Sequence, residues 1–187
     1  MYKIYIKNVS EIDTSLLSIN VLEYLSKFHD QKRYLHSLNA WYLLSSVLLE
    51  DFNIDISNKQ IFITPNGKPY IKGINFSISH SNNLVGVIIS DCICGIDIEM
   101  ISEHINHSKL SSFILTNKEL TLYKLNKNKL AYFIKKWTQK EAYLKCFNDG
   151  INKLSDLLIE CNTKTLKLKD SKGNLYYLSY IVKDHIS

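Results

Sequence analysis

The chain has 187 residues, of which 45% are hydrophobic and 22% are charged, with a formal net charge of +5. This is an ordinary globular composition, and the length permits one larger domain or two small ones. No run approaches the roughly 20 apolar residues of a transmembrane helix. The N-terminus alternates and carries charge, unlike a signal peptide. We therefore expect a cytoplasmic protein without membrane association.

The positive charge comes almost entirely from lysine, because Arg33 is the only arginine. The excess reflects either a general compositional bias or attraction to an anionic partner. Nucleic acid is a poor candidate, since no arginine cluster or basic run with interleaved aromatic residues occurs. The cysteines Cys92, Cys94, Cys146 and Cys161 lack the spacing of zinc ligands, so we expect reduced core thiols.

The first part of the chain alternates between strand and helix patterns. We predict a strand over residues 2–7, a helix over 13–27 and a strongly apolar helix over 34–49. A strand over 60–64 follows. Residues 65–69, Pro65-Asn66-Gly67-Lys68-Pro69, are predicted to form a loop, because proline and glycine interrupt both regular patterns.

Three strands are predicted to follow closely, over residues 75–79, 84–90 and 92–99. Their joins suit tight antiparallel turns. A helix is predicted over 116–125, because Thr116 and Glu119 have the spacing of a capping box. The remaining predicted elements are a helix over 128–146 and closing strands over 157–168 and 175–182.

Both halves of the chain thus run strand, helices, strands. This order predicts an α+β fold of two similar lobes, residues 1–91 and 92–187, which meet near residues 90–100. No low-complexity linker separates the halves, so we expect one compact unit.

The helix predicted over residues 128–146 places a carboxylate among apolar side chains. Three- and four-residue steps align one face, formed by Leu130, Ile134, Trp137, Glu141 and Leu144. An ionised Glu141 buried there requires a cationic partner or a metal. Lys145, one turn further on, is a candidate partner. An ordinary surface Glu–Lys pair would explain the same spacing.

A second pair of carboxylates occurs in Gly95-Ile96-Asp97-Ile98-Glu99. In a strand, Asp97 and Glu99 project to one face and the two isoleucines to the other. Adjacent carboxylates repel, and Mg²⁺ would offset the repulsion because it prefers oxygen ligands. A solvent-facing edge strand is the alternative. Together with an inward Glu141, the pair favours a metal site.

Two other segments are suited to holding a phosphate. Phe76-Ser77-Ile78-Ser79-His80-Ser81 gathers hydroxyls and a histidine at a strand end. The loop Asn66-Gly67-Lys68-Pro69 adds a flexible backbone and one cation. Both segments are also compatible with ordinary turn chemistry. No nucleophile elbow, Walker loop or dinucleotide-binding glycine motif occurs in the chain.

Taken together, these motifs resemble the 4′-phosphopantetheinyl transferases, specifically the surfactin-synthetase-activating type. In that type a single chain folds as a pseudo-dimer of two α+β lobes, with the active site between them. The resemblance spans roughly residues 65–146. It is carried by Asn66-Gly67-Lys68-Pro69, the segment 76–81, the segment 95–99, Thr116-Asn117-Lys118-Glu119 and the segment Trp137 to Lys145.

This resemblance implies that the phosphopantetheine arm of coenzyme A is moved to a serine of an apo acyl or peptidyl carrier protein, which is typically acidic. Adenosine 3′,5′-bisphosphate is released. Asp97, Glu99 and Glu141 match the Mg²⁺-binding carboxylates. The serine proton would be removed by Glu141, or by Glu119 through a water, and Lys145 would stabilise the leaving group.

The resemblance also implies that Lys68, Ser79 and His80 contact coenzyme A. The family commonly carries an arginine near the 3′-phosphate of coenzyme A, where this chain has Trp41. Lys32 and Arg33 lie just upstream and would substitute for it. The glycine-rich segment that often follows the Lys145 motif appears here only as Asn148-Asp149-Gly150. We expect a monomer.

Two other functions fit parts of the pattern. A non-catalytic module that binds coenzyme A or a carrier protein would tolerate loss of the carboxylates, yet Asp97, Glu99 and Glu141 are all present. An unrelated Mg²⁺-dependent phosphotransferase or nuclease would use the carboxylates but gives Ser79-His80 no role. The carrier would belong to fatty acid, polyketide or nonribosomal peptide biosynthesis.

Overall fold

The computed structural model describes residues 1–65, 67–147, 154–157 and 163–183. Asn66, Cys161 and the segment Asn148-Asp149-Gly150 lie outside the described residues. The first half contains β1 (Tyr2–Asn8), α1 (Ile19–Leu25), α2 (Gln31–Phe52), β2 (Phe62–Ile63), β3 (Pro69–Tyr70), β4 (Asn75–Ser81) and β5 (Leu84–Ser90). The second contains β6 (Cys94–Met100), α3 (His107–Ile114), α4 (Asn117–Leu125), α5 (Lys129–Phe147), β7 (Lys164–Lys169) and β8 (Leu175–Val182).

Most predicted elements are confirmed, including the capping box of α4, in which Thr116 and Glu119 bond reciprocally. The single helix predicted over residues 13–27 is wrong. Asp13 accepts the amide of Ser15 and begins a short 3₁₀ turn, and α1 starts separately after Ser18. Two possible helix starts within one stretch thus divide it.

Three further differences concern short elements. The strand predicted over residues 60–64 is only the two-residue β2. Of the strand predicted over 157–168, residues 158–162 lie outside the described residues, and β7 accounts for the part from Lys164 onward. Helix α3 was not predicted from its sequence. It begins at His107, after the N-cap residue Asn106, whose side chain accepts a hydrogen bond from the amide of Lys109.

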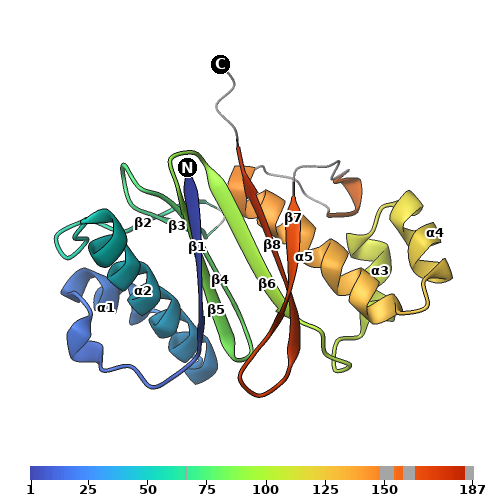
Figure 1. Ribbon diagram of the computed structural model, residues 1–187, viewed down its shortest axis with the longest axis horizontal. Coiled ribbons are helices and arrows are strands. Elements are labelled where there is room, and N and C mark those ends of the chain that lie inside the picture. The colour runs from blue at the N-terminus through green and yellow to red at the C-terminus, as the bar shows by residue number, and fades with distance from the viewer. Residues whose placement is uncertain (66, 148–153, 158–162, 184–187) are drawn as a thin grey trace.

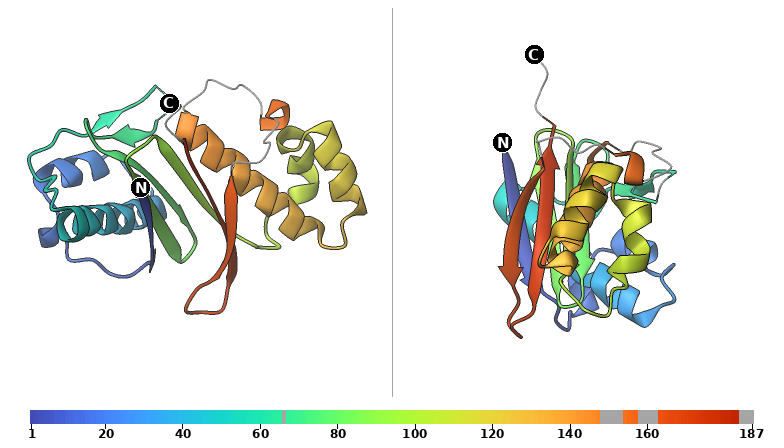
Figure 2. Two further views of the ribbon diagram at one scale, coloured as in Figure 1. Left: turned by 45° about the horizontal axis from the view of Figure 1, so that its top comes forward. Right: turned by 90° about the vertical axis from the view of Figure 1, so that its right-hand side faces the viewer.

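The strands form two three-stranded antiparallel sheets, β1-β5-β4 and β6-β8-β7, and the short pair β2-β3. Figure 1 shows α1 and α2 on the outer side of the first sheet and α3, α4 and α5 on the outer side of the second. The two sheets thus lie between two helical layers, and the turned views in Figure 2 show the same arrangement.

Hydrophobic clusters fill the spaces between these layers. Trp41 of α2 packs against Phe76 of β4 beneath the first helical layer. Ile88 of β5 and Ile96 of β6, both fully buried, lie in the cluster between the two sheets. Phe133 anchors a third cluster among α3, α4 and α5.

Helix α5 approaches β6 closely at Gly95. A Cβ at this position would lie 2.0 Å from the carbonyl oxygen of Ala142 and 2.6 Å from the amide nitrogen of Cys146. Both atoms belong to the backbone of α5, so the helix cannot make room by a side-chain rotation. A hydrogen bond of 2.9 Å between the hydroxyls of Thr138 and Ser179 joins α5 to β8.

In the described part of the chain, no helix combines the length and apolar character that crossing a membrane requires.

The packing at Gly95 gives a testable prediction. Gly95→Ala should lower the free energy of unfolding by at least the upper end of the about 1–3 kcal/mol that overpacking usually costs, because only backbone can yield. Gly86→Ala is the matched control. Its Cβ would meet the terminal methyl of Ile98 at 2.5 Å, and a side chain can move away. Urea denaturation measures both variants, and a smaller loss for Gly95→Ala than for Gly86→Ala would contradict the explanation.

Candidate active site

A cavity of about 720 Å³ lies along β4 and β6, between α2 and α5. It brings together most of the site residues predicted from the sequence. Those that line it are Arg33, Lys68, Ser79, His80, Asp97, Glu99, Glu141 and Lys145. Lys32 and Glu119 do not line it.

The alternation predicted for β6 is confirmed. Ile96 and Ile98 are fully buried in the cluster between the sheets, and Asp97 and Glu99 line the cavity. The antiparallel register with β8, in which Asp97 lies opposite Ser179, fixes this orientation. A slip of one residue would exchange the two faces, so the apolar core determines where the carboxylates point.

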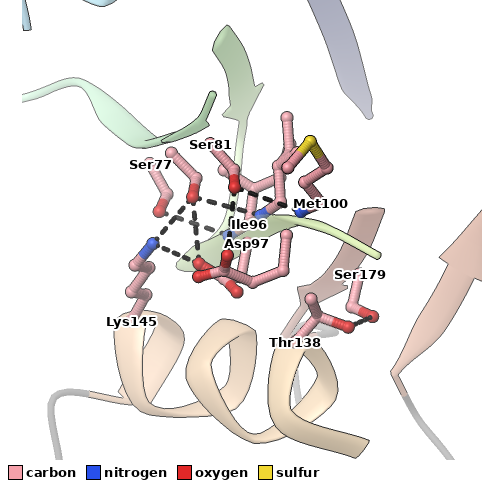
Figure 3. A network of polar contacts seen from close by, with 11 residues as sticks. Ser77, Ser81, Ile96, Asp97, Met100, Thr138, Lys145 and Ser179 are labelled. Atoms are coloured by element: carbon pink, nitrogen blue, oxygen red, sulfur yellow. Dashed lines mark hydrogen bonds and ion pairs between the residues drawn. The ribbon is translucent and has the colours of Figure 1, made fainter. Parts of the chain in front are cut away.

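Asp97 is 4% exposed, and its two oxygens differ in their surroundings. Oδ1 accepts hydrogen bonds from Lys145 Nζ at 2.7 Å and from Ser79 Oγ at 2.9 Å (Figure 3). Oδ2 is buried and has no hydrogen-bond partner. Burial raises the pKa of Asp97, and the charge of Lys145 opposes this shift. The structure therefore pairs Lys145 with Asp97, whereas the sequence suggested Glu141.

The pKa values of Glu99 and Glu141 are raised as well. Burial, followed by the charge of Asp97, raises the pKa of Glu99 to about 7. The same two causes raise the pKa of Glu141, against the charge of Lys145. Within the described ranges, no three histidine, cysteine or acidic side chains form a ready-made metal group. The three carboxylates that line the cavity repel one another when they are ionised.

The face of α5 that was predicted to be a core face is instead largely the wall of the cavity. Trp137, Glu141 and Leu144 line the cavity, and only Ile134 of the predicted set is fully buried. The core face of α5 also includes Lys140, which is fully buried. Helical periodicity identified a face but not what that face contacts.

Lys140 is a residue whose position the sequence did not reveal. Its Nζ donates to the carbonyl oxygens of Ile114 at 2.7 Å and Leu154 at 3.0 Å, and it forms an ion pair with Glu119 Oε2 at 2.8 Å. Glu119 also contacts Lys136 Nζ at 3.5 Å. Glu119 therefore joins α4 to α5 and is not among the residues that line the cavity.

Lys68 and His80 also line the cavity. Lys68 Nζ donates to the backbone carbonyl oxygens of Lys145 and Cys94, the latter at 3.4 Å, and burial lowers its pKa. The ring of His80 lies 5.0 Å from that of His36. Burial, with smaller contributions from His36 and Lys145, lowers the pKa of His80 to about 4, so this histidine is neutral near pH 7.

The far end of the cavity is aromatic and carries Arg33. The guanidinium lies 4.8 Å from the ring centre of Phe28, and Tyr24 and Ser37 complete this end. Trp41 is fully buried, and its Nε1 has no hydrogen-bond partner. Sequence reasoning missed Tyr24, Phe28 and Ser37, because their contribution depends on how α1 packs against α2.

The chain is similar to known proteins of one superfamily. The family model of the 4′-phosphopantetheinyl transferase superfamily matches residues 93–180. The chain is 33% identical over 184 residues to the 4′-phosphopantetheinyl transferase gsp of Aneurinibacillus migulanus, covering 90% of this chain and 76% of that protein. It is 29% identical over 126 residues to the 4′-phosphopantetheinyl transferase HetI of Nostoc sp., covering 63% and 53% respectively.

The chain therefore belongs to the 4′-phosphopantetheinyl transferase superfamily. The match over residues 93–180 includes Asp97, Glu99, Glu141 and Lys145 but not Lys68, Ser79 or His80. The similarity to the Aneurinibacillus migulanus protein covers 90% of the chain, and this part includes these three residues.

The buried ion pair gives a second prediction. Glu119→Gln should lower the free energy of unfolding by about 3 kcal/mol, because it removes the carboxylate that faces the buried charge of Lys140. Combining it with Lys140→Met should restore much of that loss, since no buried charge remains. Denaturation of both single variants and the double variant measures the coupling, and additive effects would exclude it.

The same pair predicts a pH dependence. Burial pushes the pKa of Glu119 upward, but the hydrogen bonds from Lys140 and the Thr116 amide outweigh it and hold the pKa below its ordinary value. The resulting stability is present above the unfolded-state pKa and is lost as pH falls through the folded-state pKa. The acid limb of stability against pH should therefore be shallower in Glu119→Gln than in wild type.

Proposed function

We propose that this protein moves the phosphopantetheine arm of coenzyme A onto a serine of an apo acyl or peptidyl carrier protein and releases adenosine 3′,5′-bisphosphate. The observation that carries the proposal is the convergence of Asp97, Glu99, Glu141 and Lys145 on one cavity. Membership of the superfamily supports it, as do the activities for which the relatives are named.

We further propose that Asp97, Glu99 and Glu141 hold Mg²⁺. The side chains fit this ion, because they offer carboxylate oxygens only and because Asp97 Oδ2 is buried without a partner. Mg²⁺ needs only one or two protein carboxylates, with water and phosphate oxygens completing its shell. Bound there, the ion would supply charge stabilisation to the pyrophosphate of coenzyme A during phosphoryl transfer.

In the reaction, the serine oxygen of the carrier forms a bond to the phosphorus next to the pantetheine arm, and the bond from that phosphorus to the bridging oxygen breaks. The serine proton must pass to a base. Glu141 is our candidate, because it lines the cavity together with Asp97 and Lys145, whereas Glu119 is committed to Lys140.

Lys145 is the cation best placed to receive the leaving bisphosphate. Its Nζ donates to Asp97 Oδ1 at 2.7 Å and to Ser79 Oγ at 3.0 Å, so it directly contacts one of the carboxylates. A phosphate oxygen arriving there would compete with Asp97 for the same ammonium group. Lys145 would then neutralise charge that develops on the departing oxygen.

The remaining cavity residues suggest how coenzyme A is oriented. His80, as a neutral imidazole, can donate one hydrogen bond to a phosphate. Arg33 places a permanent positive charge at the aromatic end, which suits the 3′-phosphate better than Lys32 does. Lys68, whose ammonium already bonds two carbonyl oxygens, contributes mainly by fixing its loop against α5.

We also propose that residues 1–91 and 92–187 are similar lobes of a pseudo-dimer. The strand order supports this, since each sheet has its first strand at one edge and its last strand in the centre, β1-β5-β4 and β6-β8-β7. The cavity draws residues from both halves of one chain, so a monomer suffices. The net charge of +5 would favour an acidic carrier protein.

The proposed function predicts that Glu141→Ala abolishes transfer. With coenzyme A, Mg²⁺ and an apo carrier protein, the wild type should add the mass of phosphopantetheine to the carrier, and the rate in Glu141→Ala should fall by about 10²-fold or more. Lys135→Ala, an exposed change on the same helix, is the control. Circular dichroism checks the fold. Undiminished transfer in Glu141→Ala would remove this residue from the mechanism.

The role of His80 gives a separate prediction. His80→Ala should weaken binding of coenzyme A about tenfold or more, which is the loss expected for a hydrogen bond to a charged group. His80→Gln keeps a neutral N–H donor and should restore most of the affinity. Calorimetric titration with coenzyme A measures both. Equal affinities for wild type and His80→Ala would place the phosphates elsewhere.

A further inference from the structure

Strands β4 and β6 lie at the edges of different sheets, yet a row of hydrogen bonds connects them. The acceptors are serine hydroxyls rather than carbonyl oxygens. The amides of Ile96, Ile98 and Met100 donate to Ser77 Oγ at 3.2 Å, Ser79 Oγ at 3.1 Å and Ser81 Oγ at 3.1 Å (Figure 3). We call this row, Ser77, Ser79 and Ser81, the serine seam.

The seam has the geometry of a parallel ladder built from side chains. Each step of two residues along β4 corresponds to a step of two along β6, so both strands run in the same direction. Edge-strand amides need acceptors when they are buried. The seam satisfies these amides of β6 without bringing the two backbones within ladder distance.

Two of the three seam hydroxyls make a second bond, to a carboxylate. Ser79 Oγ donates to Asp97 Oδ1 at 2.9 Å, and Ser81 Oγ donates to Glu99 Oε2 at 3.0 Å. A hydroxyl has one hydrogen and two lone pairs, so it can accept an amide and donate to a carboxylate at once. By accepting a β6 amide, each hydroxyl is oriented with its hydrogen available to the neighbouring carboxylate.

Ser77 differs from the other two, because the residue at the corresponding position of β6 is Gly95. No carboxylate exists there to accept its hydrogen, and Gly95 leaves the space that α5 occupies. Ser77 therefore accepts a β6 amide, as the other two serines do, but has no neighbouring carboxylate to which it could donate. Ser79 accepts a β6 amide and donates to a carboxylate. It also accepts a hydrogen bond from Lys145 Nζ at 3.0 Å, so a substitution of Ser79 would remove three interactions at once.

We propose that Ser81 is a positioning residue that holds the carboxylate of Glu99 in the orientation required for a divalent cation. This inference rests on the proposed function and extends it to a side chain that does not itself contact the reacting atoms. The bond occupies Oε2 and leaves Oε1 available to the ion. Partners that orient a ligating carboxylate commonly change metal affinity by 10–100-fold when they are removed.

The test measures binding of Mn²⁺ by electron paramagnetic resonance, with Mg²⁺ as competitor, in the full chain without coenzyme A or carrier protein. Ser81→Ala should weaken Mn²⁺ binding by about tenfold or more. Ser81→Thr keeps the hydroxyl and should stay close to the wild type. Ser77→Ala removes an equivalent seam bond without touching a carboxylate, so it should lower the melting temperature but leave Mn²⁺ affinity unchanged.

A second readout separates positioning from general damage. In the transfer assay, Ser81→Ala should raise the Mg²⁺ concentration at half-maximal rate and approach the wild-type rate when Mg²⁺ is saturating. Mn²⁺ affinity that is unchanged in Ser81→Ala, or reduced equally in Ser77→Ala, would overturn the inference. Failure of the wild type to modify any carrier would count against the proposed function, and the Mn²⁺ comparison would still decide the role of Ser81.

Discussion

The contact between α5 and β6 at Gly95 is the constraint on which the rest of the site depends. Because this position lacks a side chain, the helix backbone lies directly on the strand, with Ala142 and Cys146 within reach of a single added carbon. This proximity lets Lys145 of α5 reach Asp97 of β6 at 2.7 Å. If the helix were held further away, the carboxylates of β6 would be separated from the α5 side chains that line the same cavity.

The electrostatics of the cavity follow from this packing. Burial raises the pKa values of Asp97, Glu99 and Glu141, and the charge of Asp97 raises those of the two glutamates further. In the described structure, Lys145 alone forms an ion pair with any of the three. Lys68 is the other lysine that lines the cavity, and its ammonium group donates hydrogen bonds to backbone carbonyl oxygens. The acidic end is therefore short of positive charge, which a bound cation would supply. The proposed magnesium site would meet this need.

The sequence predicted those parts of the site that depend on local periodicity. The alternation around Asp97 and the capping box at Glu119 are properties of neighbouring residues, and the structure confirms both. The partners of Lys140 could not be predicted, because they are carbonyl oxygens of Ile114 and Leu154, which only tertiary packing brings near. For the same reason periodicity placed Glu141 on one face of α5 but could not show that this face borders a cavity. Helix α3 was not predicted, although Leu110 and Ile114 have the spacing of one helix face.

The serine seam also affects how the two halves of the molecule are joined. A backbone ladder fixes two strands at one spacing, since its donors and acceptors are rigid parts of the chain. Each rung between β4 and β6 instead ends on a side chain that turns about χ1, and each can be removed by changing one residue. The tightness of this joint is thus encoded at three separate positions. Sequence change can adjust it gradually, whereas a continuous sheet would have to be kept or lost as a whole.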